Sequence, residues 1–175
     1  QRSPGNLYGD PVKITFDPAS KTPIKLVADK VLPAIAIPAD DDNVKRFKIQ
    51  SQILTKWWGH PIYLGAVVLL PKGYDEHPDV KYPTIWEQGH FTLAPPFRFT
   101  LDSTPESAEA RARRMERTEN LGTGSDLGRA WLSDDFPRMV AIRILHPSPY
   151  YDDSYAVNSA NNGPYGDAIV EEIIP

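Results

Sequence analysis

Apolar and polar positions along the chain form four stretches that predict β-strands. Residues 44–54 (VKRFKIQSQIL) place apolar side chains two or four positions apart, the spacing that puts them on one face of a strand. Residues 62–70 (IYLGAVVLL) are almost continuously apolar, which is typical of a strand covered on both faces. Shorter apolar runs at 82–88 and 138–145 predict two further strands. Residues 55–61 are predicted to form a hairpin connection between the first two strands.

Helical spacing follows in the second half of the chain. Thr104 and Pro105 are residue types that cap and begin a helix, so a solvent-exposed helix is predicted to run to Glu119. Ser125 is predicted to cap a second helix, whose apolar face includes Trp131. A third helix begins at residues 163–164 and carries an apolar stripe that we expect to be buried. The stripe consists of Ile169, Val170, Ile173 and Ile174.

The first 43 residues differ from the rest of the chain. Residues 12–16 (VKITF) alternate in the manner of an edge strand, whereas prolines at 23, 33 and 38 interrupt the apolar positions between 21 and 42. We therefore expect residues 1–43 to form an edge strand and an extended arm over the surface. Residues 44–175 are then the first part of a larger domain.

The order of these elements predicts an α/β fold. Antiparallel lead-in strands are expected first, followed by parallel strands with crossover helices. A parallel sheet needs a further strand to cover the apolar stripe of the helix at 164–175. We expect the remainder of the same protein, or another chain, to cover that helix, because an exposed patch of this kind usually marks an interface. The domain is thus expected to be incomplete at residue 175.

Composition excludes several classes of function. The formal net charge of −4 gives no basic face for nucleic acid, and no apolar run reaches the roughly 18 residues of a transmembrane helix. The absence of cysteine excludes disulfides, thiolate nucleophiles and Cys-ligated zinc. The chain starts at Gln1, as a mature exported protein does. A secreted or periplasmic location is therefore predicted, with a cytoplasmic one left open.

The polar side chains do not form a pattern of metal ligands. The four histidines include no pair at the i,i+4 spacing of a helical zinc site. Aspartate and asparagine residues gather in the loop at 146–162, but their spacing does not match an EF-hand. Hydrogen bonding within the loop's own turns is favoured over calcium binding. No metal or cofactor is predicted.

Several short motifs occur in a fixed order along residues 44–175. They are LLPKGYD (69–75), YP (82–83), GH (89–90), DFPR (135–138), DDSY (152–155), GPYGD (163–167) and EEIIP (171–175). In these motifs the chain resembles the N-terminal portion of an esterase family of the α/β-hydrolases, which includes feruloyl-esterase-like and siderophore-esterase-like enzymes. The resemblance implies a fold more strongly than an activity.

The resemblance implies hydrolysis of a carboxylic ester through a Ser-His-Asp/Glu triad, with the serine in a Gly-x-Ser-x-Gly elbow. Residues 124–128 (GSDLG) have the wrong spacing for that elbow, so the triad is expected after residue 175. This chain alone is expected to lack esterase activity. It is expected to supply half of the oxyanion hole from the loop after the third strand. The candidates in that loop are Gln88, Gly89, His90 and Phe91.

A substrate pocket is expected beside that loop. The long polar segment at 146–167 is predicted to shape it, for a small-molecule or carbohydrate-linked ester. The predicted substrate-binding residues are Tyr151, Asp153, Tyr155 and Tyr165.

A second interpretation is a non-catalytic structural or interaction subunit with an incomplete hydrolase-like fold. The missing elbow favours it. A third class, a carbohydrate-binding β-module, fits the aromatic residues but does not fit the two helices predicted after Pro105.

Overall fold

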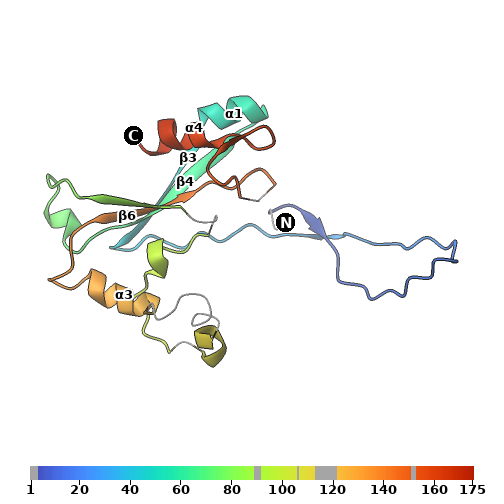
Figure 1. The fold of residues 1–175 in the computed structure, drawn as a ribbon, viewed down its shortest axis with the longest axis horizontal. Coiled ribbons are helices and arrows are strands. Elements are labelled where there is room, and N and C mark those ends of the chain that lie inside the picture. The colour runs from blue at the N-terminus through green and yellow to red at the C-terminus, as the bar shows by residue number, and fades with distance from the viewer. Residues whose placement is uncertain (1–3, 89–91, 106, 113–121, 151–152) are drawn as a thin grey trace.

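A four-stranded sheet forms the centre of the molecule (Figure 1). The computed structural model describes residues 4–88, 92–105, 107–112, 122–150 and 153–175. The strands are β3 (Val44–Ser51), β4 (Ile62–Leu69), β5 (Thr84–Glu87) and β6 (Val140–Leu145), in the order β3-β4-β6-β5. The four strands predicted from the apolar runs are confirmed, with narrower bounds.

The sheet is mixed. β3 pairs with β4 and β4 pairs with β6 in antiparallel fashion, whereas β5 runs parallel to β6. The predicted α/β content, with an antiparallel lead-in followed by a parallel pair, is therefore confirmed. Because β5 and β6 are parallel, their carboxyl ends lie at the same edge of the sheet, where open α/β sheets bind ligands.

One face of the sheet is covered by α1 (Gln52–Trp58), α4 (Tyr165–Ala168) and the π-helical turn η3 (Ile169–Ile173) (Figure 1). Leu54 of α1 and Leu64 of β4 are fully or almost fully buried there, together with Tyr165 and Ile169. Burying each such side chain contributes about 1.5–3 kcal/mol. Two of the four residues of the predicted stripe, Ile169 and Ile173, lie in this core.

The other face is covered by α3 (Gly124–Trp131) and the short 3-10 turn η2 (Pro96–Arg98). Trp131 packs there against Val67 and Phe99, and its indole N–H donates to the carbonyl of Leu70 at 2.9 Å. α3 lies on the crossover from β5 to β6 (Figure 1). The two helical layers enclose the sheet from both sides.

The predicted hairpin connection at 55–61 is wrong, because α1 occupies most of it. The Ser51 hydroxyl accepts a hydrogen bond from the Leu54 amide at 3.0 Å, which caps the helix at its start. Gly59 ends it with φ of 73°, a left-handed conformation that glycine adopts without strain. Glu172 of η3 accepts from the first amides of α1, Gln52 N–H at 2.8 Å and Ile53 N–H at 3.0 Å, and so joins the two segments.

The cap predicted for the second helix is off by two residues. Thr123, not Ser125, accepts from the Asp126 amide, and the Asp126 carboxylate accepts from the Thr123 amide in return. Of the helix predicted from Pro105 to Glu119, residues 108–112 are helical; positions 106 and 113–121 lie outside the described residues. The remaining elements are η1 (Tyr74–Glu76), β7 (Asn158–Ser159) and β8 (Gly163–Pro164), the last two forming a small hairpin.

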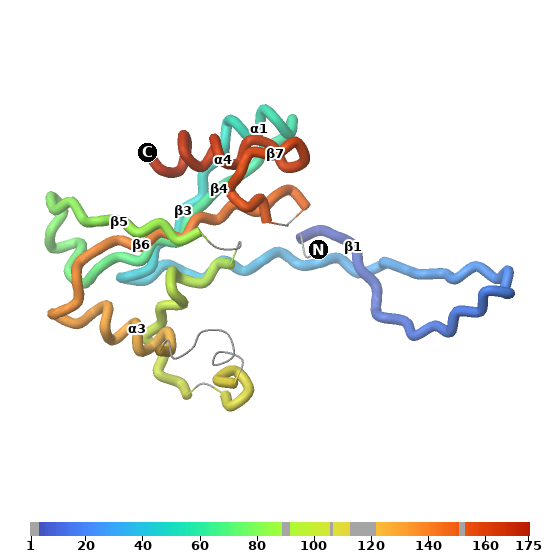
Figure 2. Tube along the Cα trace, viewed as in Figure 1, coloured from blue at the N-terminus to red at the C-terminus, as the bar shows by residue number. Residues whose placement is uncertain are grey.

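The N-terminal arm, residues 4–43, extends away from the sheet (Figure 2). The edge strand predicted at 12–16 does not form. Pairing occurs instead between β1 (Leu7–Tyr8) and β2 (Lys30–Val31). Most of the arm is extended, as its prolines predict, but much of it projects from the domain instead of wrapping over its surface (Figure 2).

Within the described ranges, no helix has the length and apolar character required to cross a bilayer.

Candidate functional site

The carboxyl ends of β5 and β6 define the candidate site. Gln88 directly follows β5, and its side-chain amide donates a 3.0 Å hydrogen bond to the carbonyl of Tyr155 in the segment after β6. This contact joins the loop predicted to form the oxyanion hole to the segment predicted to bind substrate. Gly89, His90 and Phe91 lie outside the described residues, so their role stays a prediction.

A buried ion pair lies one residue before this point. The Arg143 guanidinium contacts the Glu87 carboxylate through two hydrogen bonds, Nη2 to Oε1 at 2.6 Å and Nε to Oε2 at 3.2 Å. The two residues are direct neighbours across the parallel pair, and their side chains are only 6% and 24% exposed. Such a two-pronged contact holds both groups in one geometry.

This ion pair also anchors the chain beyond the candidate loop. Arg143 Nη1 donates to the carbonyl of Ala94 at 2.8 Å, and Glu87 Oε2 accepts from the Phe97 amide at 3.0 Å. Phe97 and Arg98 have φ values of 53° and 57°, a left-handed conformation that costs residues other than glycine about 1–3 kcal/mol each. The ion pair therefore holds residues 94–97 against the strand from which residue 88 departs.

Glu87 and Arg143 were not predicted as site residues from the sequence. A signal existed, because each is a charged residue inside a stretch predicted to be a strand. A charge placed in a buried strand requires a partner.

A Ser-His-Asp cluster lies in the segment after β6. His146 Nδ1 lies 2.8 Å from Ser154 Oγ and 3.4 Å from Asp153 Oδ1, and the three side chains are buried. In a catalytic triad the acid and the serine contact different nitrogens of the imidazole. Here both contacts fall on the same nitrogen. This geometry fits a cluster that shapes the loop and does not fit a nucleophile and its base.

The same cluster supports a strained turn. The Asp153 carboxylate accepts from the Tyr155 amide at 2.7 Å, and Ser154 Oγ accepts from the Ala156 amide at 3.2 Å. Tyr155 and Ala156 both have a φ of 53°. These hydrogen bonds stabilise a backbone turn that places the Tyr155 carbonyl against Gln88.

The predicted substrate-binding residues have different surroundings. Tyr155 is 67% exposed beside the end of β5, whereas Asp153 is buried within its own loop. Tyr165 lies in the core, and its hydroxyl donates to the Pro147 carbonyl at 2.9 Å. Burial raises the pKa of Tyr165 to about 12. Tyr151 lies outside the described residues. Tyr155 is thus the predicted contact best placed to meet a ligand, and a substrate-binding role for the four residues stays a prediction.

The glycine pair at 124 and 128 has a packing role in α3. A Cβ atom on Gly124 would lie 2.0 Å from the Arg98 carbonyl oxygen, and one on Gly128 would lie 2.3 Å from that of Thr100. The glycines therefore let α3 approach residues 98–100 closely. This close packing explains why both Gly124 and Gly128 of the GSDLG segment are glycines.

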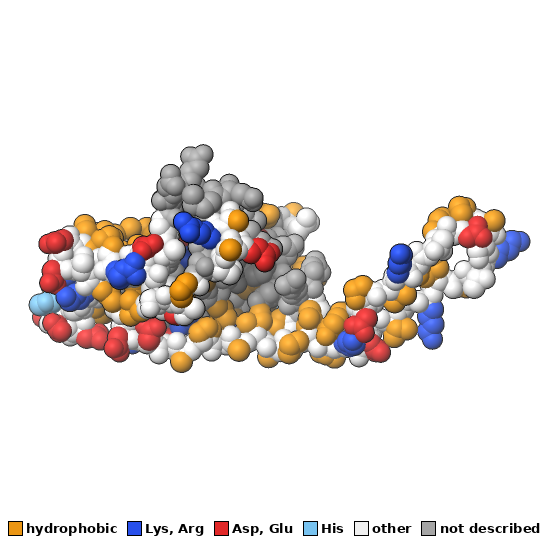
Figure 3. Space-filling view, turned by 90° about the horizontal axis from the view of Figure 1, so that it is seen from below, with side chains coloured by type: hydrophobic (Ala, Val, Ile, Leu, Met, Phe, Trp, Pro, Cys, Tyr) orange, Lys and Arg blue, Asp and Glu red, His pale blue; other side chains and the backbone are white. Residues whose placement is uncertain are grey.

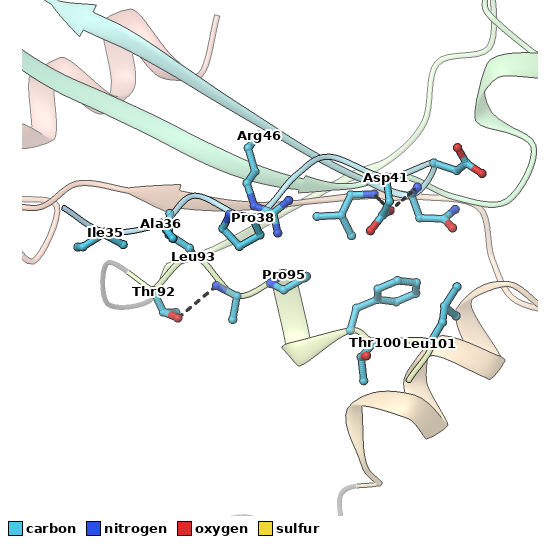
Figure 4. Close-up of a pocket in the computed structure, with 15 residues that line it drawn as sticks. Ile35, Ala36, Pro38, Asp41, Arg46, Thr92, Leu93, Pro95, Thr100 and Leu101 are labelled. Carbon is cyan, nitrogen blue, oxygen red and sulfur yellow. Dashed lines mark hydrogen bonds between the residues drawn. The ribbon is translucent and has the colours of Figure 1, made fainter. Parts of the chain in front are cut away.

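A pocket of about 950 Å³ lies between the arm and residues 92–101 (Figure 4). Ile35, Ala36 and Pro38 line it from the arm, and Leu93 and Pro95 line it from the chain that follows the candidate loop. In Figure 4 Arg46 reaches from β3 toward Pro38. The base of the arm therefore closes over the same chain segment that the Glu87–Arg143 pair anchors.

Among the described residues, no three His, Cys, Asp or Glu side chains gather as the ligands of a metal ion would.

Comparison with known proteins gives no assignment. No protein-family model matches the chain, and no curated protein matches it either. The fold and the site therefore define an α/β protein with a candidate loop at the ends of two parallel strands.

Proposed function

We propose that the protein is a serine esterase of the α/β-hydrolase type, in which these residues build the first strands of the sheet and part of the oxyanion hole. One observation carries the proposal. The loop that the resemblance assigns to the oxyanion hole leaves β5 at the carboxyl edge of the parallel pair, where Gln88 is bound to the segment after β6. Functional loops of open α/β sheets lie at this edge.

The Glu87–Arg143 pair supports the proposal further. An oxyanion hole requires donors that are held in place before the reaction, because their orientation must not change as charge develops. The ion pair fixes the chain directly before the loop, at residue 87, and shortly after it, at residues 94 and 97. Backbone N–H groups between these anchors are the proposed donors.

The proposed reaction is two-step hydrolysis. A serine Oγ attacks the ester carbonyl while a histidine accepts its proton, and the alcohol leaves after receiving that proton from the histidine. Water then attacks the acyl-enzyme in the same way and releases the acid. The serine, the acid residue and the histidine are proposed to follow residue 175, and the 146–167 segment is proposed to line the substrate pocket.

Covalent labelling of the full-length protein tests this proposal. A fluorophosphonate probe should modify one serine, and mass spectrometry should place that serine in a Gly-x-Ser-x-Gly peptide beyond residue 175. The rate of p-nitrophenyl butyrate hydrolysis should fall in proportion to the fraction of protein that is labelled. The Ser154→Ala variant should still be labelled, because Ser154 Oγ and Asp153 Oδ1 contact the same nitrogen of His146, an arrangement that does not fit a nucleophile. Absence of both labelling and hydrolysis would refute the esterase proposal.

The second candidate function is a non-catalytic interaction subunit, and a different observation favours it. Among the described residues β5 is the last strand of the sheet, and its Ile85 and Trp86 are 39% and 37% exposed. A groove of about 390 Å³ separates that edge from residues 169–174, where Val170 and Ile174 are 61% and 44% exposed. An unpaired strand edge beside apolar side chains is a site for another strand.

The intact mass of the natural protein separates the two candidates. A mass well above 19.6 kDa with a serine elbow in the additional sequence supports the esterase. A polypeptide of 19.6 kDa that copurifies in fixed stoichiometry with a second chain supports the interaction subunit.

A further inference from the structure

A second groove, of about 350 Å³, lies under the base of the arm. Its lining is mainly apolar: Ile35 and Ile37 come from the arm, Leu93 from the chain after the candidate loop, and Leu145 and Pro147 from the end of β6. It shares Ile35, Arg46 and Leu93 with the pocket of Figure 4 and extends from there along the sheet. Pockets of this size accept small organic molecules.

The floor of this groove is a row of residues across the sheet. Lys48 of β3 is opposite Gly65 of β4, and Gly65 is opposite Leu145 of β6. Gly65 lets β3 approach β4 closely here, because a Cβ atom at this position would lie 2.5 Å from the carbonyl oxygen of Phe47. Arg46 lies two residues before Lys48 on the same face of β3.

The charge of the groove has one sign. Arg46 and Lys48 both line it, and no carboxylate is among the described residues of its lining. A second arginine, Arg143 of β6, lies on the same face. Arg143 and Arg46 are the two neighbours of Val67 across the sheet, one on each side. Arg143 is already bound by Glu87. An anionic group in the groove would therefore meet two cations, with the Asp40 carboxylate 3.7 Å from Arg46 Nη1 outside the lining.

Arg46 has hydrogen-bonding capacity that its neighbours do not fill. Its side chain is 11% exposed, and Nη1 donates to the Ala39 carbonyl at 3.0 Å. The nearest ion-pair partner, Asp40, lies 3.7 Å away, beyond hydrogen-bond length. Nε is buried without an acceptor among the described residues, a costly state for a charged donor.

Lys48 contacts an aromatic ring. Its ammonium lies 4.3 Å from the centre of the Tyr63 ring, a cation–π contact that leaves its N–H groups available to a ligand. Tyr63 itself lines the groove, so the ring, the ammonium and the guanidinium follow one another along it.

We propose that this groove binds a medium-chain carboxylic acid in its ionised form. The carboxylate would accept from the Arg46 guanidinium, whose planar fork matches its two oxygens, with Lys48 as a second cation. The alkyl chain would lie against Ile35, Ile37 and Leu145. This binding does not depend on ester hydrolysis.

Calorimetric titration of the full-length protein with octanoate tests the proposal. Octanoate should bind saturably, whereas 1-octanol and octylammonium, which have the same chain without the negative charge, should bind at least tenfold more weakly. Arg46→Met should weaken octanoate binding about tenfold, because a charge-assisted hydrogen bond is lost. Lys48→Met, a change at an exposed side chain, should weaken it about threefold.

Lys45→Met is the matched control. Lys45 is on the same strand with its side chain on the opposite face of the sheet, so this variant removes the same charge without touching the groove. It should bind octanoate like the wild type. Equal weakening in Lys45→Met and Arg46→Met, equal affinity for octanol and octanoate, or no saturable binding would each overturn the proposal.

Amide chemical shifts provide a readout that does not require the arginine variant to fold. In the wild type, the amides of Gly65 and Leu145 should shift on titration with octanoate. Saturable binding that leaves both amides unshifted would place the ligand elsewhere and overturn the assignment. Failure of the esterase proposal would instead appear as absent serine labelling, with octanoate binding unchanged.

Discussion

The N-terminal arm and the sheet contain the same apolar residue types in opposite surroundings. Phe16 and Leu26 of the arm are 73% and 72% exposed, whereas Leu54 and Leu64 in the sheet domain are 0% and 1% exposed. Figure 3 shows the apolar side chains along the arm open to solvent. An alternating pattern of apolar residues therefore does not by itself specify burial. A second surface must also be available to cover the apolar side chains.

The backbone explains why the two regions differ. In β3 and β4 eight residues of each strand pair continuously, so each side chain has neighbours along and across the sheet. In the arm, two residues of β1 pair with two of β2, and prolines at 23, 33 and 38 remove amides that a ladder would need. Substitutions should accordingly have large effects in the sheet and small ones in the arm.

The largest effect is expected at the centre of the sheet. Leu64→Ala should lower the free energy of unfolding by about 2–5 kcal/mol, because it leaves a cavity beneath α1 and α4. Urea denaturation followed by circular dichroism measures this. Val170→Ala, at a 61% exposed site on η3, is the control and should change stability by less than about 0.5 kcal/mol. Equal effects at the two sites would show that Leu64 is not in a closed core.

The Glu87–Arg143 pair should have the next largest effect. Arg143→Met leaves the Glu87 carboxylate without its guanidinium and should cost about 2–4 kcal/mol in urea denaturation. The double variant with Glu87→Gln should be less destabilised than Arg143→Met alone. Hydrogen exchange should also speed up at the Phe97 amide, which Glu87 holds. Arg129→Met, at an exposed arginine, should have neither effect.

Tyr165 should give a smaller, pH-dependent effect. Its pKa is raised from 10.0 to about 12 by burial, so the folded protein retains the phenolic proton where the unfolded chain loses it. Its contribution to stability is complete below pH 10 and is lost as the pH rises toward 12, by about 2–3 kcal/mol at most. Tyr165→Phe should remove this part of the alkaline destabilisation and cost about 1–2 kcal/mol at pH 7, since Pro147 loses its donor.

Denaturation curves of both proteins at several pH values measure this difference. Tyr63→Phe, at a 44% exposed site, is the control and should follow the wild type across the range. Parallel pH profiles for Tyr165→Phe and the wild type would contradict a buried, neutral Tyr165.

The smallest effect is expected in the arm. Leu26→Ala should change the free energy of unfolding by less than about 0.5 kcal/mol, because the side chain is already 72% exposed. A loss of more than about 1 kcal/mol would show that the arm is covered by another surface in solution, and the contrast between arm and sheet would then disappear.

The candidate site was predictable in part. The end of the strand at 82–88 marked Gln88, and the polar segment after the strand at 138–145 marked Asp153 and Tyr155. The contact between Gln88 and Tyr155 was not predictable, because it spans 67 residues and depends on β5 lying parallel to β6. The burial of Tyr165 was not predicted for a similar reason. A tyrosine ring can bind a ligand at the surface or pack in the core, and only its neighbours in the folded chain decide between the two.

The sequence by itself determined where the four strands of the central sheet lie, which arm residues cannot join a long sheet, and where α3 begins to within two residues. These features follow from local patterns, namely apolar spacing, proline positions and capping side chains. The tertiary structure decided the strand order, the pairing of Glu87 with Arg143, and the placing of Arg46 and Lys48 in one apolar groove. Those depend on contacts between residues far apart in the chain, and local propensity does not encode which distant strand becomes a neighbour.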